Sequence, residues 1–312
     1  VMRVNGSASV TGTTVIDALT FDFDGANGNT SWSIGNSLTI KTASLGTFDT
    51  NSFYGSVTSS GTFLGRLVVN LDDPSDQWTM AGEMTLGGVG TIQVTRLEGS
   101  RVRFTGDLNI QNRVQVTADT LFEGFSMLSF IDGSSRLRLS GESVMKPGML
   151  VLGTGAVEVG AAGDLTLEDG VGLANAGLVN LGSLHIGAGA GEATVDRFEN
   201  DPDATWVVEI GGHAPGVEHD RLVVTSGSAV LAGELDVRVI GVFDPAPGSV
   251  FTFLQAPGTV SGTFDNDPVS FVPGKVHLWS VGSNASSAWV TLETTVPCEG
   301  ELTGDGLIDG AD

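Results

Sequence analysis

Short stretches in which apolar and polar residues alternate recur along most of this sequence. Alternation turns every second side chain to the same face of a β-strand. One series comprises Ile92-Gln93-Val94, Val114-Gln115-Val116, Leu137-Arg138-Leu139, Val157-Glu158-Val159 and Val179-Asn180-Leu181. A second series comprises Met84-Thr85-Leu86, Leu108-Asn109-Ile110, Leu128-Ser129-Phe130 and Leu150-Val151-Leu152. Helix-length stretches without Gly or Pro are scarce, so the pattern predicts an all-β chain.

The two series share one period. Successive triplets begin 22, 23, 20 and 22 residues apart in the first series, and 24, 20 and 22 residues apart in the second. A triplet cannot bury its apolar face alone, but triplets stacked coil on coil form a continuous core. Gly at the corners, as in Gly87-Gly88, permits tight turns. We therefore predict a β-solenoid (a parallel β-helix); a β-sandwich, which also has many short strands, is the alternative.

Strand length and composition divide the chain into five regions. Residues 1–77 are expected to form N-terminal coils with longer strands, and residues 78–195 coils with a period of about 22 residues. Residues 196–219 are expected to connect these coils to a β-rich C-terminal cap at 220–296, where aromatic residues become frequent and would cover the last open coil. Residues 297–312 form an acidic tail.

Composition restricts the partners. The chain of 312 residues carries a formal net charge of −23, so nucleic acid and anionic lipid surfaces would repel it and divalent cations are its natural partners. No apolar run is long enough for a membrane-spanning helix. The single cysteine, Cys298, cannot form an internal disulfide. No export signal stands at the start, so we expect a fragment of a longer protein whose signal lies elsewhere.

Three stretches near the C-terminus resemble the closing part of autotransporter-type β-solenoid repeats. They run from His219 to Val237, from Pro247 to Leu254 and from Val260 to Phe264, and the early run from Phe23 to Trp32 is similar to a turn of the same repeats. The resemblance covers about a third of the chain. It implies a bacterial surface or secreted protein with a long extracellular β-helical stalk.

The last twelve residues resemble the calcium loop of a type I dockerin, a relative of the EF-hand. The loop positions that would supply oxygen ligands are Glu301, Thr303, Asp305, the carbonyl of Leu307, Asp309 and Asp312. Gly306 stands at the sharp turn, whereas Glu at the first position and Thr at the third depart from the usual Asp and Asn. The resemblance implies a calcium site. The competing interpretation is a solvated acidic tail.

Histidines provide few candidate ligands. The four are His185, His213, His219 and His277. His185 and His277 each lie within an alternating stretch and are expected on the surface. His213 and His219, with Glu218 and Asp220, could form a zinc site, but their spacing matches no closed tetrahedral set.

Catalysis by paired carboxylates is the remaining enzymatic hypothesis, because many β-helix proteins cleave polysaccharides in this way. The candidate carboxylates are Asp72, Asp73, Asp76, Asp164, Glu168 and Asp169. They stand at predicted turns, where Asp commonly makes local hydrogen bonds. The arginines that could form a basic stripe on neighbouring coils are Arg101, Arg103, Arg136 and Arg138.

The sequence therefore favours a non-enzymatic extracellular or cell-surface structural protein: a stalk, fibre subunit or adhesin-like scaffold. Uncapped coil ends can pair, so we expect a homo-oligomer or filament, with residues 1–20 as the contact. The alternative is a carbohydrate-binding or polysaccharide-degrading β-helix whose partner is a cell-surface polysaccharide. Burial of Trp206, Trp279 and Trp289 would count against a sugar platform.

Overall fold

The computed structural model describes the strands between Met2 and Phe130 by their backbone, and the chain from Asp132 to Pro297 continuously. Side chains are described at Ile110, Val116, 119–123 and 128–130, and from Asp132 to Pro297 except at Ala174. All the described secondary structure is β, and most strands pair in parallel. The prediction of an all-β chain is confirmed for these residues.

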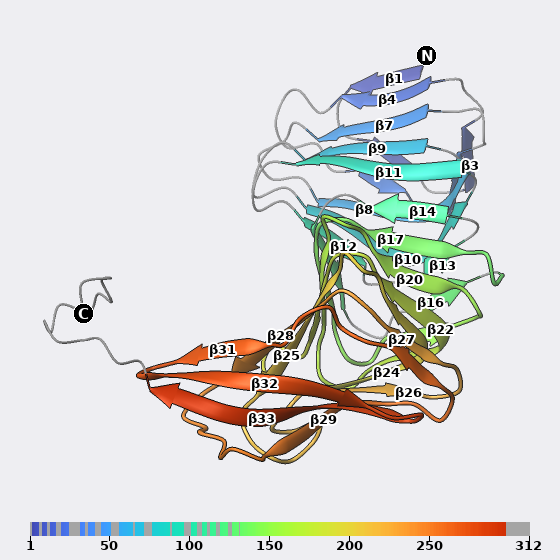
Figure 1. The fold of residues 1–312 in the computed structure, drawn as a ribbon. Helices are drawn as coiled ribbons and strands as arrows, with labels where there is room; N and C mark the ends of the chain where they lie inside the picture. The colour runs from blue at the N-terminus through green and yellow to red at the C-terminus, as the bar shows by residue number, and fades with distance from the viewer. Residues whose placement is uncertain are drawn as a thin grey trace, which may run out of the picture.

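The parallel strands form three ladders, which the chain visits in turn (Figure 1). Ladder A consists of β1 (Met2–Asn5), β4 (Thr20–Asp24), β7 (Leu45–Thr50), β9 (Arg66–Leu71), β11 (Val89–Arg96), β14 (Arg113–Val116), β17 (Arg136–Leu139), β20 (Ala156–Val159), the second halves of β22 (Val171–Asn180) and β24 (Glu192–Asn200), β27 (Ala229–Leu231) and β30 (Val260–Gly262).

Ladder B follows the first turn of each coil. It consists of β2 (Ala8–Val10), β5 (Trp32–Ile34), the first halves of β8 (Ser56–Leu64) and β10 (Gln77–Gly87), β12 (Arg101–Phe104), β15 (Asp119–Phe122), β18 (Glu142–Met145), β21 (Asp164–Leu167), β23 (Ser183–Ile186), β25 (Thr205–Ile210) and β28 (Glu234–Val239).

Ladder C completes each coil. It consists of β3 (Thr13–Ile16), β6 (Ser37–Ile40), the second halves of β8 and β10, β13 (Leu108–Ile110), β16 (Met127–Phe130), β19 (Leu150–Leu152), the first halves of β22 and β24, β26 (Arg221–Val224) and β29 (Val250–Gln255).

Three antiparallel strands follow at the C-terminal end. They are β31 (Val269–Val272), β32 (Lys275–Ser283) and β33 (Ser287–Pro297), and β33 pairs with the last strand of ladder C. Figure 1 shows them in red, extending across the end of the stack opposite to the N-terminus. β32 and β33 have 9 and 11 residues, lengths that β8 and β10 also reach.

The core lies between the ladders. Each ladder turns alternate side chains inward, for example Leu137 and Leu139 from ladder A, Leu165 and Leu167 from ladder B, and Val151 from ladder C. The outward positions of the same strands, such as Arg138, are half-buried. Parallel pairing aligns equivalent residues of successive coils, so the inward rows form one continuous apolar cluster.

Three pairings between successive triplets differ from the predicted register. Ile92 pairs with Val116 and not with Val114, a shift of two residues that leaves the strand faces unchanged. The other two are shifted by one residue. Val157 pairs with Leu178, not with Val179, and Met127 pairs with Leu150, which leaves Leu150 51% exposed. A shift of one residue moves every side chain to the opposite face. Asn180 therefore points inward, where its Nδ2 donates a hydrogen bond of 2.8 Å to Oδ1 of Asn200 on the next coil, and this bond makes its burial possible.

Candidate functional site

The turn between ladder B and ladder C grows towards the C-terminal end. It spans residues 168–170 after β21 and 187–191 after β23, then 211–220 after β25 and 240–249 after β28. In repeat proteins, insertions gather on one side, which is often the binding side. We call the segments 187–191, 211–220 and 240–249 the corner loops and examine them as the candidate site.

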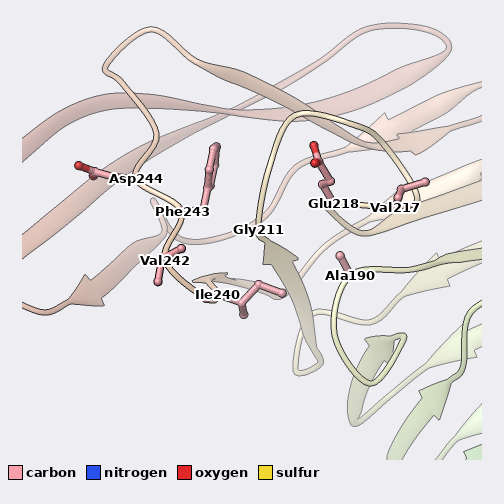
Figure 2. Close-up of a pocket in the computed structure, with 9 residues that line it drawn as sticks. Ala190, Gly211, Val217, Glu218, Ile240, Val242, Phe243 and Asp244 are labelled. Atoms are coloured by element: carbon pink, nitrogen blue, oxygen red, sulfur yellow. The ribbon is translucent and has the colours of Figure 1, made fainter.

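An open pocket of about 560 Å³ lies among the corner loops. Most of its lining is apolar, and the side chains that line it are Ala190, Val217, Glu218, Ile240, Val242, Phe243 and Asp244. Figure 2 shows Phe243 and Asp244 on one side of Gly211, and Val217 and Glu218 on the other. An oxygen of each carboxylate already has a partner: Glu218 accepts a hydrogen bond of 3.0 Å from the Ala214 N–H, and Asp244 pairs with Lys275 at 2.6 Å.

Asp220 is the buried carboxyl group of the corner loops. Its side chain joins two coils, because Oδ1 accepts the Gly191 N–H at 3.0 Å and Oδ2 accepts the Glu209 N–H at 2.7 Å. The residue is only 1% exposed. Burial raises the pKa of Asp220 to about 8, although both N–H donors favour the charged form. The side chain thus fixes the path of the 211–220 loop and responds to pH.

His219 is held by backbone carbonyls. Its Nδ1 lies 3.2 Å from the carbonyl of Gly212, and its Nε2 lies 3.3 Å from that of Thr252. Burial lowers the pKa of His219. His213 is exposed and stacks on the ring of Phe251, with ring centres 5.1 Å apart. A neutral imidazole has a single N–H, so His219 donates to one of these two carbonyls at a time, while both Asp220 oxygens accept backbone N–H groups. Among the described residues these side chains do not form a group placed to hold zinc.

A third connection links the corner loops to the antiparallel strands. Asp244 lies close to Lys275 and His277, which are two residues apart on β32. Its Oδ2 is 2.6 Å from Lys275 Nζ, and its Oδ1 is 3.7 Å from His277 Nε2. The hydrogen bond from Lys275 holds the pKa of Asp244 below its usual range, whereas burial lowers that of His277. The expectation that His277 lies on the surface is wrong: it is fully buried, and neither ring nitrogen has a hydrogen-bond partner.

The candidate carboxylates and arginines of the enzymatic hypothesis have structural partners or lie on different ladders. Asp164 lies 3.5 Å from the Nε2 atom of His185. Asp169 accepts the Glu192 N–H at 3.0 Å, a bond to a residue 23 positions later and not the local bond expected of a turn residue. His185 is half-buried between two inward-pointing neighbours. The predicted arginine stripe does not form, because Arg101 and Arg103 belong to ladder B, whereas Arg136 and Arg138 belong to ladder A.

The proposed calcium ligands lie outside the described residues. These are Glu301, Thr303, Asp305, Leu307, Asp309 and Asp312; the side chains of Asp72, Asp73 and Asp76 are outside them as well. Within the part of the chain that is described, no group of three or more His, Cys, Asp or Glu side chains is placed to hold a metal ion. The calcium loop stays a prediction from the sequence.

Sequence reasoning missed the roles of Asp220, Asp244 and His277. Local pattern gave no signal for them, because each takes its environment from residues distant along the chain, such as Gly191 for Asp220 and Lys275 for Asp244. The lengthening of the turns after β25 and β28 could have been noticed in the sequence. The number of residues between strands that pair on successive coils rises there from about 22 to about 30.

No known protein family matches the chain, and no curated protein does. Among the described residues there is no helix, and thus none that is long and apolar enough to cross a membrane. The functional argument therefore depends on the strand pairing and on the corner loops.

Proposed function

We propose that this chain is a non-enzymatic structural protein of the extracellular space or cell surface, built as a β-solenoid that serves as a stalk or scaffold. The observation that carries the proposal is the pairing of each strand with its equivalent in the next coil, along three ladders at once. A β-sandwich would pair its strands mainly in antiparallel fashion, so the parallel ladders favour the solenoid.

A stack of this kind resists bending because both its backbone hydrogen bonds and its apolar core run along the stacking axis. Backbone hydrogen bonds join each coil to the next, and the inward rows of Leu, Val and Ile pack without interruption. The surplus of acidic residues on such a stack keeps separate copies soluble and attracts divalent cations. These properties suit a spacer that holds another module away from a surface.

Location and cofactor follow from resemblance. The likeness to autotransporter-type repeats supports secretion from a bacterium, and the dockerin-like tail supports calcium binding at residues 301–312. Self-assembly into filaments through residues 1–20 belongs to the same proposal.

The carbohydrate alternative has less support. A sugar platform needs several exposed aromatic rings in a row, but Trp206 and Trp279 are buried in the core, Trp289 is half-buried on β33, and Phe271 on β31 is the strongly exposed ring of the described cap. The pocket among the corner loops offers Phe243 as its aromatic side chain. No observation therefore favours this function over the structural one.

Pulling the chain by its two ends tests the proposal. Stacked coils should detach one at a time, and each coil of about 22 residues should extend the chain by roughly 75 Å. The last coils, of about 30 residues, should give steps of roughly 100 Å. A single step that releases the whole chain would contradict the solenoid. Electron microscopy with and without calcium then tests the filament.

A further inference from the structure

The pocket among the corner loops has two walls, and backbone hydrogen bonds hold each of them in place. The first wall, 211–220, is closed by a bond of 2.6 Å from the Gly211 N–H to the Glu218 carbonyl. The second wall is the loop after β28, where the Gly248 N–H donates to the Leu292 carbonyl at 2.7 Å. A wall that is already ordered loses little conformational freedom when a ligand binds, so this cost of binding is small.

Apolar side chains at the mouth of the pocket are in contact with solvent. Val217 on the first wall is 75% exposed, and Val242 on the second wall is fully exposed. Ile240 and Phe243, both half-buried, continue this apolar surface into the pocket. Single exposed apolar residues are common on protein surfaces, but several around one hollow form a lining that suits the apolar part of a ligand.

The pocket also carries a negative charge that no neighbouring cation balances. Glu218 and Asp244 are the charged residues of the lining, and Asp244 is neutralised by Lys275 at 2.6 Å. Glu218, on the side of the pocket opposite Phe243 (Figure 2), has no ion-pair partner among the described residues. Its Oε2 accepts the Ala214 N–H at 3.0 Å, which fixes the carboxylate beside the pocket. The lining therefore attracts a cation and repels an anion.

We propose that this pocket binds a small organic cation, with an alkyl or aromatic body against Ile240, Val242 and Phe243 and an ammonium group beside Glu218. Its volume of about 560 Å³ lies within the range of small-molecule sites. The apolar body supplies most of the affinity, because an ion pair at an exposed carboxylate contributes little. Glu218 determines which charge the pocket accepts. The site is independent of the proposed role of the stack as a stalk.

Titration with phenylethylammonium tests the proposal, with phenylethanol and phenylpropionate as the neutral and anionic counterparts. The methyl NMR signals of Val217, Ile240 and Val242 should shift in a saturable way with the ammonium, with a Kd of roughly 1 mM. Phenylethanol should bind about three- to fivefold more weakly, and phenylpropionate more weakly still. The methyl signals of Val157 and Leu165, in the regular coils, should not move.

Three variants separate the charged part of the site from the apolar part. E218Q should weaken the binding of phenylethylammonium about three- to fivefold and leave that of phenylethanol unchanged. V242S, at a fully exposed position, should weaken the binding of both probes alike. E199Q removes the same charge from an exposed position on ladder A and should change neither affinity.

Each part of the proposal has an outcome that contradicts it. Equal losses of affinity in E218Q and E199Q would show that only the net charge of the chain matters, and not Glu218. Equal affinities for phenylethylammonium and phenylpropionate would overturn the preference for a cation. Methyl shifts that do not saturate with any of the three probes would overturn the binding site itself.

Discussion

The coils between Asp132 and Val195 differ from the last coils in both perimeter and filling. In the first region, paired residues are 19 to 22 positions apart, as for Leu137 with Val157, and the interior holds mainly Leu, Val and Ile, with Met145 and Met149. In the second region, the spacing is 29 to 32, and Trp206, Phe198 and Phe253 fill the interior. The longer coils thus coincide with larger core side chains and with the corner loops, while the strand pairing is unchanged.

The largest loss of stability is expected in the last coils, when the ring of Trp206 is removed. The side chain is fully buried and contacts Phe198 and Phe253, with ring centres 4.9 and 5.1 Å apart. W206A should lower the free energy of unfolding by about 3–5 kcal/mol, measured by denaturant titration. L165A, in the regular coils, should cost less, because a smaller side chain leaves a smaller cavity.

W206F is the matched control. It keeps an aromatic ring and removes the indole N–H, which has no hydrogen-bond partner. The loss should stay below about 1.5 kcal/mol. If W206F cost as much as W206A, contacts between the rings would not be what stabilises the last coils.

Two glycines at turns, one in each region, differ in how closely the next coil approaches them. Gly153 and Gly241 both have positive φ, of 90° and 67°. A Cβ on Gly153 would lie 2.1 Å from the Phe130 carbonyl oxygen of the preceding coil, whereas one on Gly241 would meet nothing within 4 Å. G241A should cost about 1–2 kcal/mol, the penalty of the left-handed backbone alone. G153A should cost more, and equal losses in thermal unfolding would show that close stacking does not govern the regular corners.

The all-β character of the described residues, and the spacing of about 22 residues between paired strands, could be predicted from the sequence because both depend on local alternation. Register could be predicted only in part. Val114 does pair with Leu137 and Leu137 with Val157, but the preference for apolar residues inside failed at Val179. There the inward position belongs to Asn180, whose hydrogen bonds to Asn200 and Thr205 come from later in the chain. A sequence pattern cannot include partners that only the stacked structure supplies.

The candidate site was less predictable for the same reason. His277 alternates with Val276 and Leu278, and hydropathy places the two apolar residues inside. The structure does the reverse, because β32 packs its Trp279 face against the stack and exposes Leu278. The antiparallel pairing of the cap decides which face is buried, and no local signal encodes it.

Stability should depend on pH through Asp220, which lies in the last coils. The unfolded chain releases the Asp220 proton near pH 4, whereas burial raises the pKa in the folded state to about 8. Between about pH 4 and pH 8 the folded state therefore holds a proton that the unfolded state has lost. The contribution of Asp220 to stability is thus greatest below about pH 4, falls as the pH rises to about 8, and is constant above that.

D220N separates this effect from the other carboxyl groups. Asn cannot titrate, and it keeps only one acceptor for the N–H groups of Gly191 and Glu209, so it should cost about 1–3 kcal/mol. The cost relative to the unmodified chain should shrink as the pH rises from 5 to 8, which denaturation at several pH values would measure. A cost that grows over this range would contradict the raised pKa.

The smallest effect is expected at the link between the corner loops and the cap. K275M removes the ion-pair partner of Asp244, whose side chain is more than half exposed, so the loss of stability should be smaller than in the variants above and should vanish at high salt. R238M is the control, because Arg238 pairs with Asp236 of the same strand and joins no two elements. Both variants should cost similar free energies, but K275M alone should speed hydrogen exchange in the 240–249 loop, because it removes the shorter of the two contacts that Asp244 makes with β32, the other being that with His277 at 3.7 Å. Equal exchange in the two variants would mean that packing around Phe243 and Trp279, and not the ion pair, holds the loop against the cap.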